Sequence, residues 1–141
     1  MRSGTEKGAV SSDDHGCSGC HTPGVFQGNP DTQRPLAGSE VGFKIPRLGY
    51  FYPPNLTPDP ETGLGKWSNA QIITAIRKGQ RPDGRELAPI MPWRNYAALT
   101  DDDAKAVAAY LKSLTPVRNQ VPAVTGDTEK APGPYLTVVV P

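Results

Sequence analysis

Cysteine, histidine and methionine are scarce in this sequence, with two of each among 141 residues. No hydrophobic run approaches the roughly 20 residues that a membrane-spanning helix needs, so the sequence predicts no transmembrane segment. The net charge is only +1, which argues against a nucleic-acid partner, because binding to a phosphate backbone needs a strongly basic surface. Hydrophobic residues make up 36% of a chain that also has 16 prolines and 15 glycines. We therefore expect one loop-rich domain whose own apolar core is small.

Both cysteines lie in one short motif, Cys17-Ser18-Gly19-Cys20-His21. This C-x-x-C-H pattern is typical of the covalent attachment of a c-type haem. The two thiols would form thioethers with the two vinyl groups of the porphyrin, and the histidine would ligate the iron. The motif therefore predicts haem c as the cofactor, bound by Cys17, Cys20 and His21, with His21 as a metal ligand. The porphyrin would also supply apolar core that the sequence lacks.

Two other interpretations of the motif remain open. A C-x-x-C pair can be a disulfide or a thioredoxin-like redox pair, but that interpretation needs a strand before the motif, and residues 11–16 have no strand character. A zinc site would need His15 together with the two cysteines and His21. These four residues lie within seven consecutive positions, whereas zinc sites usually draw their ligands from two separated pairs. Haem is the better-supported prediction.

Met91 is the candidate for the second axial ligand of the iron. It lies between Pro89 and Pro92, which would hold the backbone extended and stiff. Buried methionine is more often core than ligand, but a small haem domain without a third histidine leaves the sixth position to Met91, to His15 or to no residue. His15 is too close in sequence to Cys17 to cross the ring plane easily, so we expect Met91 to ligate the iron.

The proximal histidine needs an acceptor for its second ring nitrogen. A proline-bearing loop after a haem motif often presents a backbone carbonyl to the Nδ1–H of the ligating histidine, which fixes the ring and its tautomer. Pro35 is the first candidate for this role, followed by Pro30 and Pro23. Each could equally be an ordinary loop proline.

Polar and aromatic residues elsewhere are candidates for contact with the haem. Asn55 and Thr57 follow a cluster of three aromatics and would donate hydrogen bonds to the propionates. Trp67 and Trp93 are the candidates for rings beside the haem or near a propionate. The alternatives are a surface loop for the first pair and core packing for the tryptophans.

The helical signals are clear in two places and weak at the N-terminus. Ser68 and Gln71 predict a capping box, and Gly79 predicts the end of that helix. A second helix is predicted to begin at Thr100 and to end before Pro116. Glycines weaken a helix over residues 1–16, so we expect it to be short and frayed, or its core contacts to come from elsewhere.

The C-terminal part is proline-rich and ends in the apolar run Tyr135–Val140. This run predicts an edge strand or an extended arm, and because an exposed β-prone run promotes aggregation, we expect it to be covered. We expect a monohaem domain over residues 1–122 and a Pro-rich extension over 123–141 that packs on the domain or extends from it.

The chain resembles the class I c-type cytochromes, in particular the bacterial monohaem kind associated with dehydrogenases. The resemblance implies an all-α fold around one haem with His/Met ligation, an electron-transfer function, and redox proteins as partners, with a dehydrogenase as donor and an oxidase or another cytochrome as acceptor. The resemblance covers residues 17–122, and its motifs are Cys17–His21, Asn55–Asp59, Arg81–Arg85, Pro89–Trp93 and Ala109–Leu111.

A periplasmic location is implied as well, because covalent haem attachment to this motif normally takes place outside the cytoplasm. The chain starts Met1-Arg2-Ser3-Gly4 without a signal peptide, so we expect it to be a trimmed form. Two other functions are weighed beside electron carriage. One is a haem subunit or domain of a larger dehydrogenase complex, and the other is a gas-binding sensor in which Met91 leaves the iron.

Overall fold

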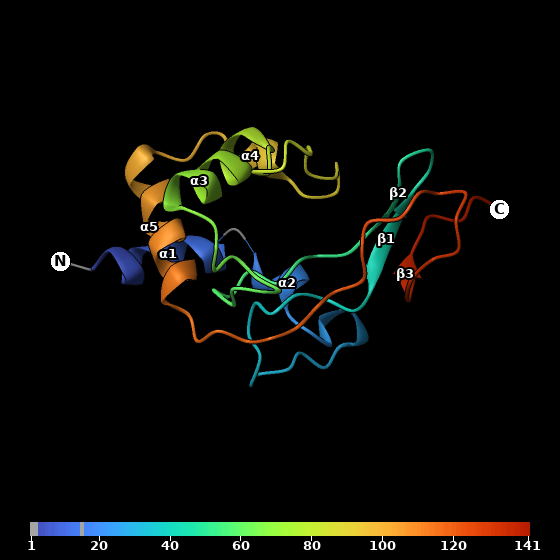
Figure 1. The fold of residues 1–141 in the computed structure, drawn as a ribbon, viewed down its shortest axis with the longest axis horizontal. Coiled ribbons are helices and arrows are strands. Elements are labelled where there is room, and N and C mark those ends of the chain that lie inside the picture. The colour runs from blue at the N-terminus through green and yellow to red at the C-terminus, as the bar shows by residue number, and fades with distance from the viewer. Residues whose placement is uncertain (1–2, 15) are drawn as a thin grey trace.

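The computed structural model describes residues 3–14 and 16–141, and describes no side chain from residue 10 to residue 15. His15, the alternative iron or zinc ligand, lies outside the described residues. Helices gather at one end of the molecule and a small sheet lies at the other, with the haem motif between them (Figure 1). The helices are α1 (Gly4–Asp14), α2 (Ser18–His21), α3 (Asn69–Lys78), α4 (Trp93–Tyr96) and α5 (Asp101–Ser113), with a 3-10 turn η1 (Val25–Gln27).

The two longest predicted helices begin where the capping residues place them. The Ser68 side chain accepts a hydrogen bond from the backbone N–H of Gln71, and the Gln71 side chain accepts one from the backbone N–H of Ser68, so the capping box before α3 is confirmed. Gly79 ends α3 in the left-handed region, with φ of 69°. The Thr100 hydroxyl caps α5 by accepting from the backbone N–H of Asp103 at 3.1 Å.

The apolar core lies between α3, α5 and the long loops. Its buried members come from both helices and from loop residues that are distant in sequence: Leu36, Leu64, Ile72, Val107, Ala108 and Leu111. Cys17 and Trp67 pack against this cluster. The haem motif is therefore built directly onto the only core cluster found among the described residues, which holds its backbone in place.

Helix α1 is longer and better packed than the sequence predicts. It crosses α5, and Gly8 is the point of closest approach, because a Cβ atom there would overlap the backbone carbonyl of Ala106 and the side chain of Tyr110. The glycine that lowers helix propensity is thus the residue that allows the two helices to touch. The helix expected to be short and frayed therefore has 11 residues and packs against α5.

The all-α prediction is wrong. Helices make up only 30% of the chain, and the structure has a three-stranded sheet in the order β2-β1-β3. Strand β1 (Gly42–Ile45) pairs antiparallel with β2 (Gly49–Phe51) and parallel with β3 (Tyr135–Leu136). The hairpin β1–β2 extends away from the helices, and the C-terminal segment runs beside it (Figure 1).

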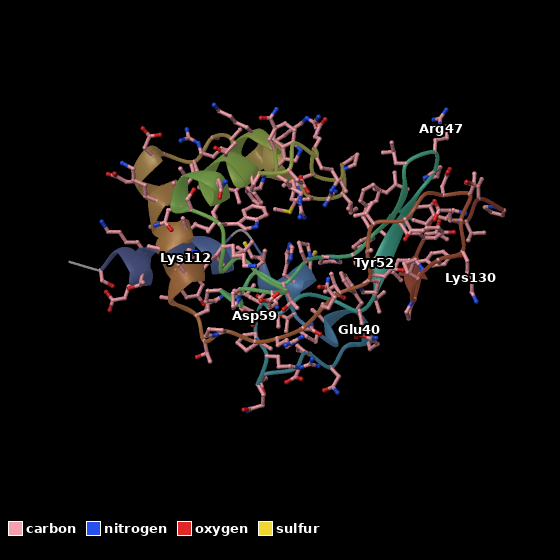
Figure 2. All side chains as sticks on the ribbon, in the orientation of Figure 1. Glu40, Arg47, Tyr52, Asp59, Lys112 and Lys130 are labelled. Carbon is pink, nitrogen blue, oxygen red and sulfur yellow. The ribbon has the colours of Figure 1, made fainter. Side chains whose placement is uncertain are left out.

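The sheet escaped the sequence analysis for two physical reasons. Its strands have only two to four residues, too few for a clear alternation of apolar and polar positions. The third strand also comes from a segment that is distant in sequence, and such pairing leaves no local signal. Tertiary hydrogen bonds fix this arrangement instead, including those from Gly42 N to the Pro134 carbonyl and from the Tyr52 hydroxyl to the Gly133 carbonyl, whose donor Tyr52 is labelled in Figure 2.

The C-terminal run is not covered as expected. Tyr135 and Leu136 form β3 but are 40% and 46% exposed, and Val138, Val139 and Val140 are 81–88% exposed. Earlier parts of the same segment are attached to the hairpin: Thr125 forms an isolated bridge with Tyr50, and the Asp127 carboxylate accepts from the backbone N–H of Arg47. The segment is therefore fixed up to β3, and the valines project beyond it.

The α1–α5 contact gives a direct test of this fold. Alanine at position 8 improves helix propensity by about 1 kcal/mol, but overpacking against α5 costs about 1–3 kcal/mol. Gly8→Ala should therefore lower the free energy of unfolding, measured by denaturant titration. Gly4→Ala is the matched control, because a Cβ at Gly4 meets no atom within 4 Å, and it should be neutral or stabilising. Equal effects of the two substitutions would contradict the close crossing.

Candidate haem-binding site

The three residues of the haem motif differ in exposure in a way that suits their roles. Cys17 is half-buried against the core, Cys20 is exposed, and His21 at the end of α2 is only 7% exposed. Neither cysteine takes part in a disulfide, so the structure does not contain the disulfide that the alternative interpretation requires. The motif offers two thiols at the edge of the site and one imidazole inside it.

The imidazole of His21 is fixed by the backbone carbonyl of Pro54, whose oxygen lies 2.8 Å from Nδ1. The sequence analysis favoured Pro35, which is exposed and does not take this role. The chain after the motif turns back instead, so that the backbone N–H of Gly38 donates to the His21 carbonyl at 2.7 Å. This turn brings the 36–39 segment alongside the loop after β2, and the loop supplies the acceptor.

The position of the proton on His21 follows from this contact. A carbonyl oxygen can only accept, so Nδ1 carries the hydrogen and Nε2 carries the lone pair. Burial lowers the pKa of His21, and the hydrogen bond to the Pro54 carbonyl opposes that effect only in part. The ring is therefore neutral near pH 7, which is the form that ligates a metal.

Met91 lies at the end of a loop that is closed by its own backbone hydrogen bonds. The N–H of Leu87 donates to the Gly79 carbonyl at 2.8 Å, and Gln80 bridges to Glu86. Met91 itself donates to the Ala88 carbonyl. Its carbonyl accepts from the N–H of the first α4 residue at 2.8 Å. The thioether thus stands on a backbone with little freedom to move.

Two buried nitrogen atoms near this loop have no hydrogen-bond partner, and they are the only such side-chain atoms among the described residues. One is Nε1 of Trp93, whose ring covers Gly79 so closely that no Cβ would fit there. The other is Nε of Arg81, which has only a 3.4 Å ion-pair contact with Asp83. A buried N–H without an acceptor is costly, so both atoms call for an acceptor supplied by a bound group.

The charges in the same loop favour an anionic group. Desolvation first, and then the nearby positive charge of Arg81, lower the pKa of Arg85. Arg81 and Arg85 place two partly buried positive charges in one loop, an arrangement that would suit an anionic group. The donor set of the site therefore fits a haem: two thiols, a neutral imidazole, a thioether, and unpaired N–H and guanidinium groups that would hold its propionates.

Asn55 and Thr57 do not have free polar groups to offer a propionate. They are 1% and 0% exposed, and each makes hydrogen bonds to protein atoms only. Trp67 packs against the core, with the guanidinium of Arg81 5.6 Å from its ring centroid. Of the predicted contacts, Trp93 is therefore placed with an open donor, whereas Asn55 and Thr57 serve the loop that carries Pro54.

Three further groups contribute to the site and have no clear signal in the sequence. The Pro54 carbonyl is a backbone group, which no side-chain pattern marks. Arg81 was noted only as part of a motif, and its unpaired Nε appears only in three dimensions. Tyr96 in α4 is buried, and burial followed by the nearby thiols of Cys17 and Cys20 raises the pKa of its hydroxyl. Tyr96 therefore lies beside the thiols.

The geometry defines a site for covalent haem attachment, and the comparisons agree. The family model described as cytochrome c matches residues 5–115, and the chain belongs to the cytochrome c family. It is a haem protein that carries electrons and not an enzyme with its own substrate. None of the described helices is both long and apolar enough to cross a membrane.

Similar proteins are parts of dehydrogenases. The chain is 41% identical over 107 residues to one of the subunits of the nicotinate dehydrogenase of Pseudomonas putida, and the match covers 76% of this chain and 8% of that protein. It is 37% identical over 112 residues to the cytochrome c subunit of a quinone alcohol dehydrogenase of Gluconobacter oxydans. This match covers 77% of this chain and 22% of that protein. It is 40% identical over 96 residues to the fructose dehydrogenase cytochrome subunit of Gluconobacter japonicus, and this match covers 67% of this chain and 18% of that protein. The chain thus spans less than a quarter of the length of these three relatives.

The unpaired indole N–H gives a testable consequence. If Trp93 donates a hydrogen bond to a haem propionate, Trp93→Phe removes an interaction that stabilises the ionised propionate. The pKa of that propionate should therefore rise. The pH-dependent step in the reduction potential of the haem protein should then move to higher pH. Trp67→Phe is the control, because the indole nitrogen of Trp67 is not one of the buried atoms that lack a hydrogen-bond partner. It should leave the pH of this step unchanged. A step that stays in place in the Trp93 variant would contradict this role.

Proposed function

We propose that this protein carries one electron at a time on a single covalently attached haem, ligated by His21 and Met91, in the periplasm. The observation that carries the proposal is the buried, neutral His21, which comes directly after Cys20 in a motif whose cysteines form no disulfide, and which is held through Nδ1 by the Pro54 carbonyl. The haem supplies the iron that gains and loses the electron. One haem motif, which uses both cysteines, supports a single haem.

The residues around the haem favour electron carriage over chemistry on a substrate. His21 on one side and Met91 on the other would leave no open position on the iron. Both ligands stand on constrained backbone, His21 through its bond to Pro54 and Met91 through its bond to Ala88. Because the ligands can move little between the two oxidation states, little reorganisation accompanies electron transfer.

Trp93 and Arg81 are proposed to hold the propionates, as their unpaired donors indicate. Cys17 and Cys20 are proposed to hold the opposite edge. Because Cys20 is exposed, this edge is where a partner would come close enough to exchange an electron.

The names of the relatives support a dehydrogenase as electron donor. The acceptor that we propose, an oxidase or another cytochrome, is implied by the resemblance of the sequence to class I c-type cytochromes. The chain would then act as a haem subunit or haem domain within, or beside, a dehydrogenase. We propose a haem domain over residues 1–122, to which the 123–141 extension adds β3 as an edge strand of the sheet. Covalent attachment of the haem, the rule for this motif, supports the periplasm as the location.

Absorption spectra of the purified protein test the axial ligands. The native protein should show sharp c-type bands on reduction, a weak long-wavelength band from sulfur to iron when oxidised, and no response to carbon monoxide. Met91→Ala should bind carbon monoxide and should lower the reduction potential by more than about 59 mV, a tenfold change in the one-electron equilibrium. Ile90→Ala is the matched control, because Ile90 adjoins Met91 and is 52% exposed; it should behave like the native protein.

The same experiment addresses the sensor alternative. A rapid response of the native protein to carbon monoxide would mean that the sixth position is open or labile. Met91 would then be a loop residue, and gas binding would replace electron carriage as the best-supported function.

A further inference from the structure

We propose that Asn55 is a positioning residue for the proximal histidine. Its side chain ties the peptide that bears the Pro54 carbonyl to the segment after α5, and thereby sets the strength of the His21–Pro54 hydrogen bond and the reduction potential of the iron. This inference rests on the proposed ligation by His21.

Every polar atom of the Asn55 side chain is used inside the protein. Oδ1 accepts from the backbone N–H of Thr57 at 2.9 Å and from its hydroxyl at 2.7 Å. Nδ2 donates to the Val117 carbonyl at 2.7 Å and to the Thr62 hydroxyl at 3.1 Å. The side chain is 1% exposed. An amide with two donors and two accepting positions, all filled in a buried site, has one orientation only.

The backbone N–H of Asn55 and the carbonyl of Pro54 belong to the same peptide plane. On either side of that plane the backbone is held by other hydrogen bonds: Ser39 N–H donates to the Pro53 carbonyl at 2.9 Å, and Leu56 N–H donates to the Leu36 carbonyl at 2.8 Å. The remaining freedom is rotation of the 54–55 peptide itself. The anchored Asn55 side chain fixes the Cα atom at one end of this peptide and thereby restricts its movement while the carbonyl faces His21.

The Asn55 side chain is anchored to a part of the chain that is distant in sequence, the segment after α5. Val117 follows α5, and its N–H donates to the Thr57 hydroxyl at 3.1 Å, so that Val117 is bound through both its N–H and its carbonyl. Asn119 adds a separate hydrogen bond, which its Nδ2 donates to the Ala37 carbonyl at 2.8 Å. In Figure 1 the chain after α5 runs from the helices across to the sheet. The loop that orients His21 is thus attached to a distant part of the chain.

The link to the iron follows from ligand basicity. A carbonyl that accepts from Nδ1–H makes the imidazole a stronger electron donor through Nε2, which stabilises Fe(III). If the 54–55 peptide rotates, the bond weakens and Fe(III) loses stabilisation. The reduction potential should therefore rise when the Asn55 anchor is removed, although Asn55 does not touch the iron or its ligand.

Asn55→Ser and Asn55→Leu test the inference in the haem-loaded protein. Serine is too short to reach the Val117 carbonyl, and leucine keeps the approximate shape of the side chain without a donor, an acceptor or a charge. Each should shift the Fe(III)/Fe(II) equilibrium about tenfold toward Fe(II), or about 59 mV for one electron. Each should also speed solvent exchange of the His21 Nδ1–H. The leucine variant tests the anchor even if the serine variant does not fold.

Gly8→Ala is the matched control for a merely structural role. It disturbs the contact between α1 and α5 and lies outside the Pro54 loop and its hydrogen bonds, so it should lower the denaturation midpoint and leave the potential unchanged. Equal midpoint losses in all variants with no change in potential would overturn the inference, while the native His/Met spectrum would leave the proposed function standing. A native protein whose haem is not ligated by His21 would overturn both.

Discussion

The hydrogen bond between His21 Nδ1 and the Pro54 carbonyl is the contact on which the rest of the site depends. It joins the haem motif to a loop 33 residues further along the chain. That loop is held in turn by the 36–39 segment and by the residues after α5. The bond sets the tautomer of the imidazole, the direction of its free lone pair and, through its strength, the electron density offered to the iron.

Around this contact a chain with few apolar residues builds a rigid site mainly from backbone and buried polar groups. Asn55, Thr57, Thr62 and Asp59 form a connected set of hydrogen bonds under the proximal loop. Hydrogen bonds from the Thr62 hydroxyl and backbone lower the pKa of Asp59, which is labelled in Figure 2 between the helical end and the sheet. Rigidity of this kind suits an electron carrier, because ligands that stay in place keep the reorganisation of each transfer small.

Local signals in the sequence predicted what depends on local physics. The capping box at Ser68 and the cap at Thr100 place the starts of α3 and α5, and the five-residue motif predicts haem attachment. The contacts that depend on tertiary structure were not predictable in the same way. Pro54 acts through its carbonyl, and Gly8 is favourable only because α5 passes over it. Strand β3 forms only because β1 lies beside it. The roles of Met91 and Trp93 remain predictions from the sequence, now supported by a constrained loop and an unpaired N–H.

The most direct test of this account is nitrogen NMR of the reduced haem protein with ¹⁵N-labelled histidine. With only two histidines in the chain, the ring signals can be assigned by comparison with a His15→Gln variant. We predict one Nδ1–H resonance from His21 that exchanges slowly with solvent and is shifted as expected for a strong hydrogen bond to a carbonyl. A His21 Nδ1–H that exchanges as fast as a solvent-exposed imidazole would contradict the central role of the Pro54 carbonyl.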